Sequence, residues 1–165
     1  MASDSNQPDM TIIKPFIEGT LQTLKVQCAL NATHGKPYIK GSGPDVQSSI
    51  AAVLGLTSTA FRGSLSICFP EATFLAIMGR LLGETYTQIT TDLEDGAGEL
   101  LNIIFGFAKK VLNERSHTFE KAIPTVVRGE GLSVRHLTNQ ATLILPFESE
   151  LGAFAIEICI EKNTE

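Results

Sequence analysis

The sequence predicts an α+β fold, in which long helices pack on one face of an antiparallel sheet. Two observations support this prediction. Strand-like segments follow one another in groups, without the regular alternation of strands and helices that builds a parallel sheet, and longer segments carry apolar residues at helical spacing. The chain has 165 residues, of which 43% are hydrophobic and 19% are charged, so it can bury a core of ordinary size.

Three segments are predicted to be helical. Residues 12–30 carry apolar side chains at helical spacing, and residues 70–83 begin with a proline and end with a glycine, as helices commonly do. The longest helix is expected to run from Thr90 or Thr91 to about Glu114, because a hydroxyl residue followed by several acidic residues suits a helix N-terminus.

Other apolar segments have the alternation and the flanking turn residues of strands. A hairpin is expected from residues 46–56 and 60–69, after a short strand around Tyr38. The second half of the chain is predicted to add strands at residues 122–128, 142–147 and 152–160.

Residues 10–162 are expected to form a single domain that follows a flexible, polar tail at residues 1–9. The tail lacks the apolar run of a secretory signal, and no uninterrupted apolar segment reaches the ~18 residues of a membrane helix. We therefore expect a cytoplasmic protein. The net charge of −5 and the absence of a Lys/Arg cluster argue against nucleic acid or an anionic membrane as the main partner.

Several common types of chemical site are not indicated by the sequence. Cys28, Cys68 and Cys159 are far apart and lie in apolar runs, which predicts reduced, buried thiols. The three histidines, His34, His117 and His136, have no metal-ligand spacing with each other or with the cysteines. Each is more commonly a surface residue or a satisfied core residue than a base, and we expect no metal or cofactor bound by this chain.

The helix predicted at residues 90–114 has a polar face with distinct features. At about 100° per residue, its buried stripe is expected to contain Leu100, Ile103, Ile104, Phe107 and Val111. The opposite side then carries Asp95, Glu99, Asn102, Gly106 and Lys109. Residues at i and i+3 are neighbours on a helix surface, so Glu99 and Asn102 project together.

Such a face is usually no more than a solvated surface. Asn102 and Gly106 are unusual there, because Asn is a weak helix former and Gly costs about 1 kcal/mol relative to Ala in a helix. Gly106 also removes bulk beside Asn102, which would let another protein approach closely.

The run Asp95, Glu99, Asn102 within DGAGELLN resembles the D/S-x-x-x-E-x-x-N signature of the CheC, CheX and FliY phosphatases. Residues 13–24 (IKPFIEGTLQTL) resemble the opening helix of CheX proteins, and residues 122–131 (AIPTVVRGEG) resemble the strand after their active helix. CheC and FliY carry the signature twice, whereas the first helix here has Glu18 but Leu21 where Asn is needed. A single site favours CheX.

The resemblance to CheX implies a phosphatase that accelerates hydrolysis of the aspartyl phosphate of a CheY-like receiver domain. By this resemblance Asn102 orients the attacking water, Glu99 pairs with the receiver's lysine, and the Mg²⁺ belongs to the receiver. Asp95, Gly106 and Lys109 are candidates for partner binding only, and Asp95 is better explained by its place near the helix start. The resemblance also implies a homodimer formed by joining sheets.

Two other functions remain open at the level of the sequence. The same helix face could bind a receiver without hydrolysis, as an adaptor or a flagellar-switch component does. Alternatively, the chain could be an oligomerisation domain whose polar helix face is merely solvated. Neither the target receiver nor the pathway, whether flagellar motility, pilus motility or another two-component system, follows from these residues.

Overall fold

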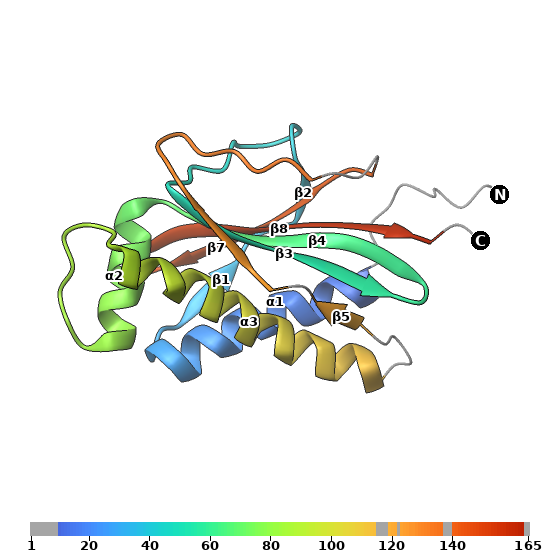
Figure 1. The fold of residues 1–165 in the computed structure, drawn as a ribbon, viewed down its shortest axis with the longest axis horizontal. Coiled ribbons are helices and arrows are strands. Elements are labelled where there is room, and N and C mark those ends of the chain that lie inside the picture. Colours follow the sequence, from blue (N-terminus) through green and yellow to red (C-terminus); the bar gives the residue numbers. More distant parts are fainter. Residues whose placement is uncertain (1–9, 115–118, 122, 137–139, 164–165) are drawn as a thin grey trace.

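An antiparallel sheet with two long helices along one face forms the body of the protein (Figure 1). The computed structural model describes residues 10–114, 119–121, 123–136 and 140–163. Helices α1 and α3 cross the same side of the sheet, and α2 lies at one end of it (Figure 1). The α+β fold class predicted from the sequence is confirmed.

The helices begin and end close to the predicted residues. They are α1 (Met10–Cys28), α2 (Glu71–Leu82) and α3 (Thr91–Glu114). Helix α2 follows Pro70 and ends at Gly83, which has φ of 73° and donates its backbone N–H to the carbonyl of Gly79. At the start of α3, the Thr90 hydroxyl accepts a hydrogen bond from the backbone N–H of Leu93 at 3.4 Å.

All strand pairs among the described residues are antiparallel, and the main order across the sheet is β1-β7-β8-β4-β3-β5. Two further strands lie at its margins, where β2 pairs with β7 and β6 pairs with β3. The strands are β1 (Ala32–His34), β2 (Tyr38–Ile39), β3 (Ile50–Ser58), β4 (Phe61–Phe69), β5 (Phe119–Lys121), β6 (Thr125–Arg128), β7 (Leu143–Ser149) and β8 (Gly152–Lys162).

The predicted hairpin is confirmed as β3 and β4, in which Leu54 lies opposite Leu65. The strand predicted at residues 122–128 is shorter than expected, because β6 begins at Thr125 and a separate short strand, β5, precedes it. Ala122 lies outside the described residues.

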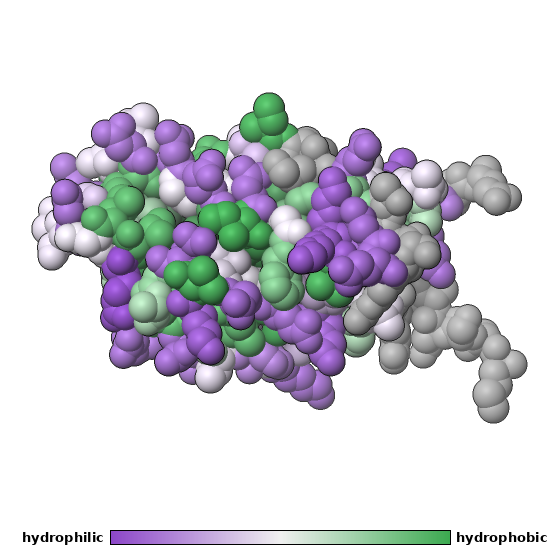
Figure 2. All heavy atoms as spheres, turned by 90° about the horizontal axis from the view of Figure 1, so that it is seen from below, coloured by the Kyte–Doolittle hydropathy of each residue, from purple (hydrophilic) through white to green (hydrophobic). Residues whose placement is uncertain are grey.

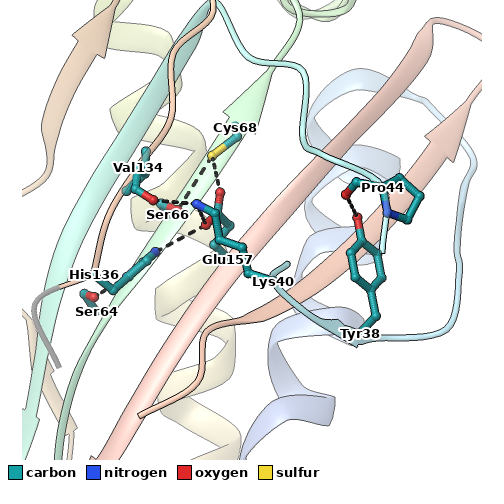
Figure 3. Close-up of polar contacts among 9 residues, drawn as sticks. All are labelled: Tyr38, Lys40, Pro44, Ser64, Ser66, Cys68, Val134, His136 and Glu157. Carbon is teal, nitrogen blue, oxygen red and sulfur yellow. Dashed lines mark hydrogen bonds and ion pairs between the residues drawn. The ribbon is translucent and has the colours of Figure 1, made fainter. Parts of the chain in front are cut away.

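Both faces of the central strands are covered. On the helix side, β8 buries Phe154, Ile156 and Ile158, each at most 4% exposed. Ile160, the fourth apolar residue of the alternation expected to face inward, is half-buried. On the other side lie Glu157 of β8 and Ser66 of β4, beneath the segments around Lys40 and His136 (Figures 1 and 3). The sheet is therefore buried on two sides, although only one carries helices.

Helix α3 is turned about its own axis relative to the predicted orientation, so that a different set of its side chains faces the sheet. Leu100 and Ile104 are buried as expected, but Ile103 is 38% exposed, and Phe107 and Val111 are half-buried. The buried arc instead continues through Ala97, Leu101, Phe105, Ala108 and Leu112. The reason is that α3 packs against both α1 and the sheet, so its buried arc is wider than a stripe facing a single neighbour.

Gly19 of α1 allows α3 to approach closely. A Cβ atom at Gly19 would lie 3.0 Å from the Phe107 ring and 3.2 Å from the Ile104 carbonyl. Among the described helices, none is long and apolar enough to cross a membrane.

Candidate functional site on the outer face of α3

The structure brings Glu99 and Asn102 together on one side of α3. Glu99 is exposed and Asn102 is half-buried. Because they are three residues apart on a helix, their Cβ atoms are about 5–6 Å from each other. The remaining residues that the sequence placed on this face are also found there: Asp95 and Gly106 are exposed, and Lys109 is half-buried.

The amide oxygen of Asn102 is not used by the fold. Its Oδ1 atom is buried and has no hydrogen-bond partner in the structure. A buried polar atom without a partner costs about 1–3 kcal/mol, so residues inside a helix seldom retain one without a reason. Asn102 is therefore held in place by the backbone of α3 and not by a structural hydrogen bond of its oxygen.

Strand β6 lies beside the same part of α3. A Cβ atom at Gly98, one turn before Asn102, would lie 3.6 Å from Val126 and 3.7 Å from Pro124. Arg128 adds a polar connection, since its Nε atom is 3.1 Å from Glu94 Oε1 and its guanidinium donates to the carbonyl of Ile89. These contacts join the sheet margin to the start of α3, and therefore fix the helix that carries Glu99.

The centre of the exposed α3 face is open. A Cβ atom at Gly106 would meet nothing within 4 Å, and the neighbouring Ile103 is an exposed apolar side chain. Viewed from the helix side, the surface is a mixture of hydrophilic side chains and apolar groups (Figure 2). Ile103 was expected in the core, so the apolar centre of this face was not predicted from the sequence.

A second cluster of polar side chains lies on the opposite face of the sheet (Figure 3). Glu157 is only 2% exposed and pairs with Lys40 Nζ at 2.8 Å. His136 is hydrogen-bonded to Ser64 through Nδ1, and its Nε2 atom is 3.6 Å from Glu157 Oε1. Lys40 also donates to the carbonyl of Val134 at 2.5 Å. The cluster thus fastens two connecting segments to the sheet.

Burial and neighbouring charges shift the pKa values of two groups in this cluster, lowering that of Glu157 and raising that of Cys68. Burial raises the pKa of Glu157, but His136 and Lys40 beside it outweigh that effect and hold the pKa below its ordinary value. Burial, together with the nearby Glu157 charge, raises the pKa of the Cys68 thiol to about 12. Cys68 Sγ donates to Glu157 Oε2 at 3.5 Å. The cluster therefore contains a buried carboxylate and a protonated thiol at neutral pH.

This cluster was not predicted from the sequence. One signal was available, because Glu157 lies between Ile156 and Ile158 in an otherwise apolar strand, and a buried carboxylate requires a partner.

The three histidines were each expected to be a surface residue or a satisfied core residue. His34 is exposed, His136 is a buried, hydrogen-bonded residue, and His117 lies outside the described residues.

No metal-binding group is found in the described part of the chain, where no three His, Cys, Asp or Glu residues gather closely enough to hold an ion. Cys28, Cys68 and Cys159 are free and buried, which confirms the prediction of reduced thiols. On α1, Glu18 is exposed and Leu21 occupies the position where a second signature would need Asn.

Comparison with known protein families shows to which family the chain belongs. The family description "Chemotaxis phosphatase CheX" matches residues 50–148, a range that contains all of α3. The chain belongs to the CheX family. No curated protein sequence matches this CheX-family chain.

Solved structures agree with this CheX assignment. A CheC-like superfamily protein from Shewanella sp. PV-4 is 33% identical with a TM-score of 0.87, covering 93% of this chain and 99% of that one. CheX from Vibrio vulnificus is 34% identical with a TM-score of 0.85, covering 91% and 99%. CheX from Borrelia burgdorferi, solved with CheY, BeF₃ and Mg²⁺, is 22% identical with a TM-score of 0.77 and covers 91% and 97%; this last likeness concerns the fold.

Proposed function

We propose that this CheX-family protein accelerates hydrolysis of the aspartyl phosphate on a CheY-like receiver domain, with Glu99 and Asn102 as its catalytic residues. The observation that carries the proposal is the pair itself: an exposed carboxylate one turn from a carboxamide whose oxygen has no partner in the fold. The family assignment and the B. burgdorferi complex of CheX with CheY support a receiver as the partner.

The proposed chemistry requires little from the phosphatase beyond positioning. Water attacks the phosphorus in line, the bond between phosphorus and the receiver's aspartate oxygen breaks, and the products are inorganic phosphate and the free carboxylate. Because phosphoryl transfer depends mainly on position and charge, a side chain that holds the water in line can supply most of the acceleration. The Mg²⁺ belongs to the receiver.

Asn102 is suited to hold that water. A carboxamide has both a donor and an acceptor. When the side chain turns its buried Oδ1 atom toward the receiver, Oδ1 can accept a hydrogen bond from the water, and Nδ2 can donate one to a phosphoryl or metal-bound oxygen. Glu99, one turn earlier and exposed, would pair with the receiver's active-site lysine and fix the approach. Asp95, Gly106 and Lys109 would surround this contact on the same helix.

The proposal includes a homodimer and a cytoplasmic location. In the described residues the sheet ends with β1 and β2 on one side and with β5 and β6 on the other, and edge strands of a sheet can join two copies. Light scattering of the purified chain should give the mass of two copies. A monomer at micromolar concentration would remove the dimer from the proposal and leave the α3 chemistry untouched.

The decisive experiment measures phosphate release from CheY-type receivers of the same organism, phosphorylated in the presence of Mg²⁺. The wild-type protein should shorten the phosphoryl lifetime, and Glu99→Ala or Asn102→Ala should remove the effect. Glu18→Ala and Gln22→Ala are matched controls, because both residues are exposed and lie on the neighbouring helix α1 and not on α3. Stable receiver binding without acceleration would instead indicate an adaptor.

A further inference from the structure

Charges on the exposed face of α3 are separated by sign along the helix. Asp92, Asp95 and Glu99 are exposed in its first half, while Lys109 and Lys110 lie in its second half. The apolar side chain of Ile103 and the open position at Gly106 lie between the two groups. Glu114, at the helix end, is the exception to this order.

The helix dipole does not account for this arrangement. Its effect on nearby charges falls off within the first and last turns, whereas Asp95, Glu99, Lys109 and Lys110 all lie further inside α3. Asp95 and Glu99 are also four residues apart, and two like charges at this spacing destabilise a helix by about 0.2–0.5 kcal/mol. The fold thus tolerates an unfavourable pair of charges.

These charges also have no ion-pair partner within the described structure. Glu94, on the side of α3 that faces β6, pairs with Arg128, and Glu18 of α1 pairs with Lys14. No corresponding ion pair involves Asp95, Glu99 or Lys110 among the described residues. The two charged groups are therefore available to a partner.

The spacing of the groups fits one partner domain. At 1.5 Å per residue, Asp95 and Lys110 are about 22 Å apart along the helix axis. This distance exceeds two Debye lengths at physiological salt, which are about 8 Å each, so a partner would sense the two charges separately. A standard interface covers about 800 Å² on each protein, so both groups fit within one contact centred near Ile103.

We propose that α3 orients the receiver by charge. A basic patch of the receiver would lie against Asp95 and Glu99, an acidic patch would lie against Lys109 and Lys110, and the apolar contact would form at Ile103. This inference rests on the proposed function, because it takes a receiver as the partner. Complementary charges of this kind mainly set the orientation and the rate of association.

The double variant Asp95→Lys/Lys110→Glu tests the orientation, because it inverts the order of charges and leaves the net charge at −5. Binding is measured to a CheY-type receiver of the same organism loaded with beryllofluoride and Mg²⁺, at 50 and 500 mM NaCl. The wild-type protein should bind more weakly at high salt. The double variant should bind at least tenfold more weakly than the wild type at 50 mM NaCl and lose most of this salt dependence.

The control variant, Lys36→Glu/Glu148→Lys, makes the same exchange at two exposed residues away from α3. It should bind within twofold of the wild type. Circular dichroism verifies that the variants fold, and Asp95→Asn/Lys110→Gln replaces the inverted pair if they do not; this milder pair should weaken binding about threefold.

Unchanged affinity in the inverted variant would overturn the orientation, and so would a wild-type protein that does not bind the loaded receiver. Phosphate release with the same receiver is measured separately. Acceleration combined with unchanged affinity rejects only the orientation by charge. Charge-dependent binding without acceleration rejects only the phosphatase.

Discussion

Glu157 and Lys40 form an ion pair of 2.8 Å on the face of the sheet that carries no helix, and Glu157 is 2% exposed. The two residues are separated by 117 positions in the sequence. Their contact therefore connects the segment after β2 with a central strand, and Cys68 and His136 complete the surroundings of the carboxylate. This buried charge gives the fold a specific dependence on pH.

The first prediction concerns acid stability. The pKa of Glu157 is lowered from its ordinary value of 4.5 in the folded protein. Its contribution to the free energy of unfolding is therefore fully present above that value and is lost as the pH falls through the lower, folded pKa. Urea unfolding of the wild type between pH 6 and pH 3 should show this loss, and Glu157→Gln should flatten it.

At pH 7, Glu157→Gln should lower the free energy of unfolding by about 2–3 kcal/mol. Removing one partner of a buried ion pair costs about 3–5 kcal/mol, and we expect less here because the Lys40 side chain is 33% exposed and can reach water. Glu161→Gln is the control, since its pair with Arg62 is near the surface and should contribute at most about 1 kcal/mol. Equal losses in the two variants would contradict the prediction.

The second prediction concerns the Cys68 thiol, whose pKa is raised to about 12. Only the thiolate reacts with alkylating agents. At pH 8 the thiolate fraction of Cys68 should be about 10³-fold smaller than that of a free cysteine with a pKa near 8.5. Mass spectrometry after iodoacetamide treatment should find Cys68 unmodified in the folded protein and modified in guanidinium chloride. Rapid modification under native conditions would show that the cluster opens readily.

The third prediction separates stability from docking at Gly106. Because nothing lies within 4 Å of a Cβ atom there, Gly106→Ala should stabilise α3, by up to about 1 kcal/mol. The added methyl group would stand on the docking face, so receiver affinity should fall severalfold. Thermal unfolding and receiver binding are measured on the same variant.

Gly98→Ala is the matched control for Gly106→Ala, because the added methyl group would lie at ordinary distances from Val126 and Pro124 on the β6 side of α3. It should change helix propensity without adding bulk to the outer face. Receiver binding that is unaffected by Gly106→Ala would argue against close contact at this position.

Local signals explain which parts of the fold could be predicted from the sequence. The ends of α2 follow from Pro70 and Gly83, and the start of α3 follows from the Thr90 cap, since each is determined by residues close in sequence. The rotation of α3 was predicted incorrectly because it depends on α1 and the sheet together. Small residues such as Ala97 and Ala108 are buried there, and a pattern of large apolar residues does not reveal them.

The functional residues and the buried polar cluster also differ in how far they could be predicted from the sequence. Glu99 and Asn102 could be identified because their spacing on one helix is a local property. The Glu157 cluster could not, because Lys40 and His136 come from segments without regular structure that fold over the sheet. Ile103 was placed in the core because the sequence pattern does not show on which sides a helix has neighbours.

The last prediction compares two replacements of Asn102. Asn102→Asp should be nearly as harmful to phosphatase activity as Asn102→Ala, with each lowering the acceleration by about 10²-fold, because misplacing a reacting group by about 1 Å can have an effect of this size. Asp keeps the shape of Asn but has acceptors only when ionised, so it would repel the phosphoryl oxygens. It would also add a negative charge one turn from Glu99, where like charges are unfavourable.

Stability should distinguish this effect from damage to the fold. Asn and Asp have similar helix propensities, and Asn102 Oδ1 makes no hydrogen bond that either replacement would remove. Asn102→Ala removes the unpaired buried oxygen and favours the helix, so its free energy of unfolding should not fall. Asn102→Asp places a carboxylate at the same buried position and should lose about 1–3 kcal/mol. In both variants, phosphate release from the receiver should fall to near its spontaneous rate. If Asn102→Asp retained most of the acceleration, the amide donor would be dispensable, and Asn102 would act by shape alone.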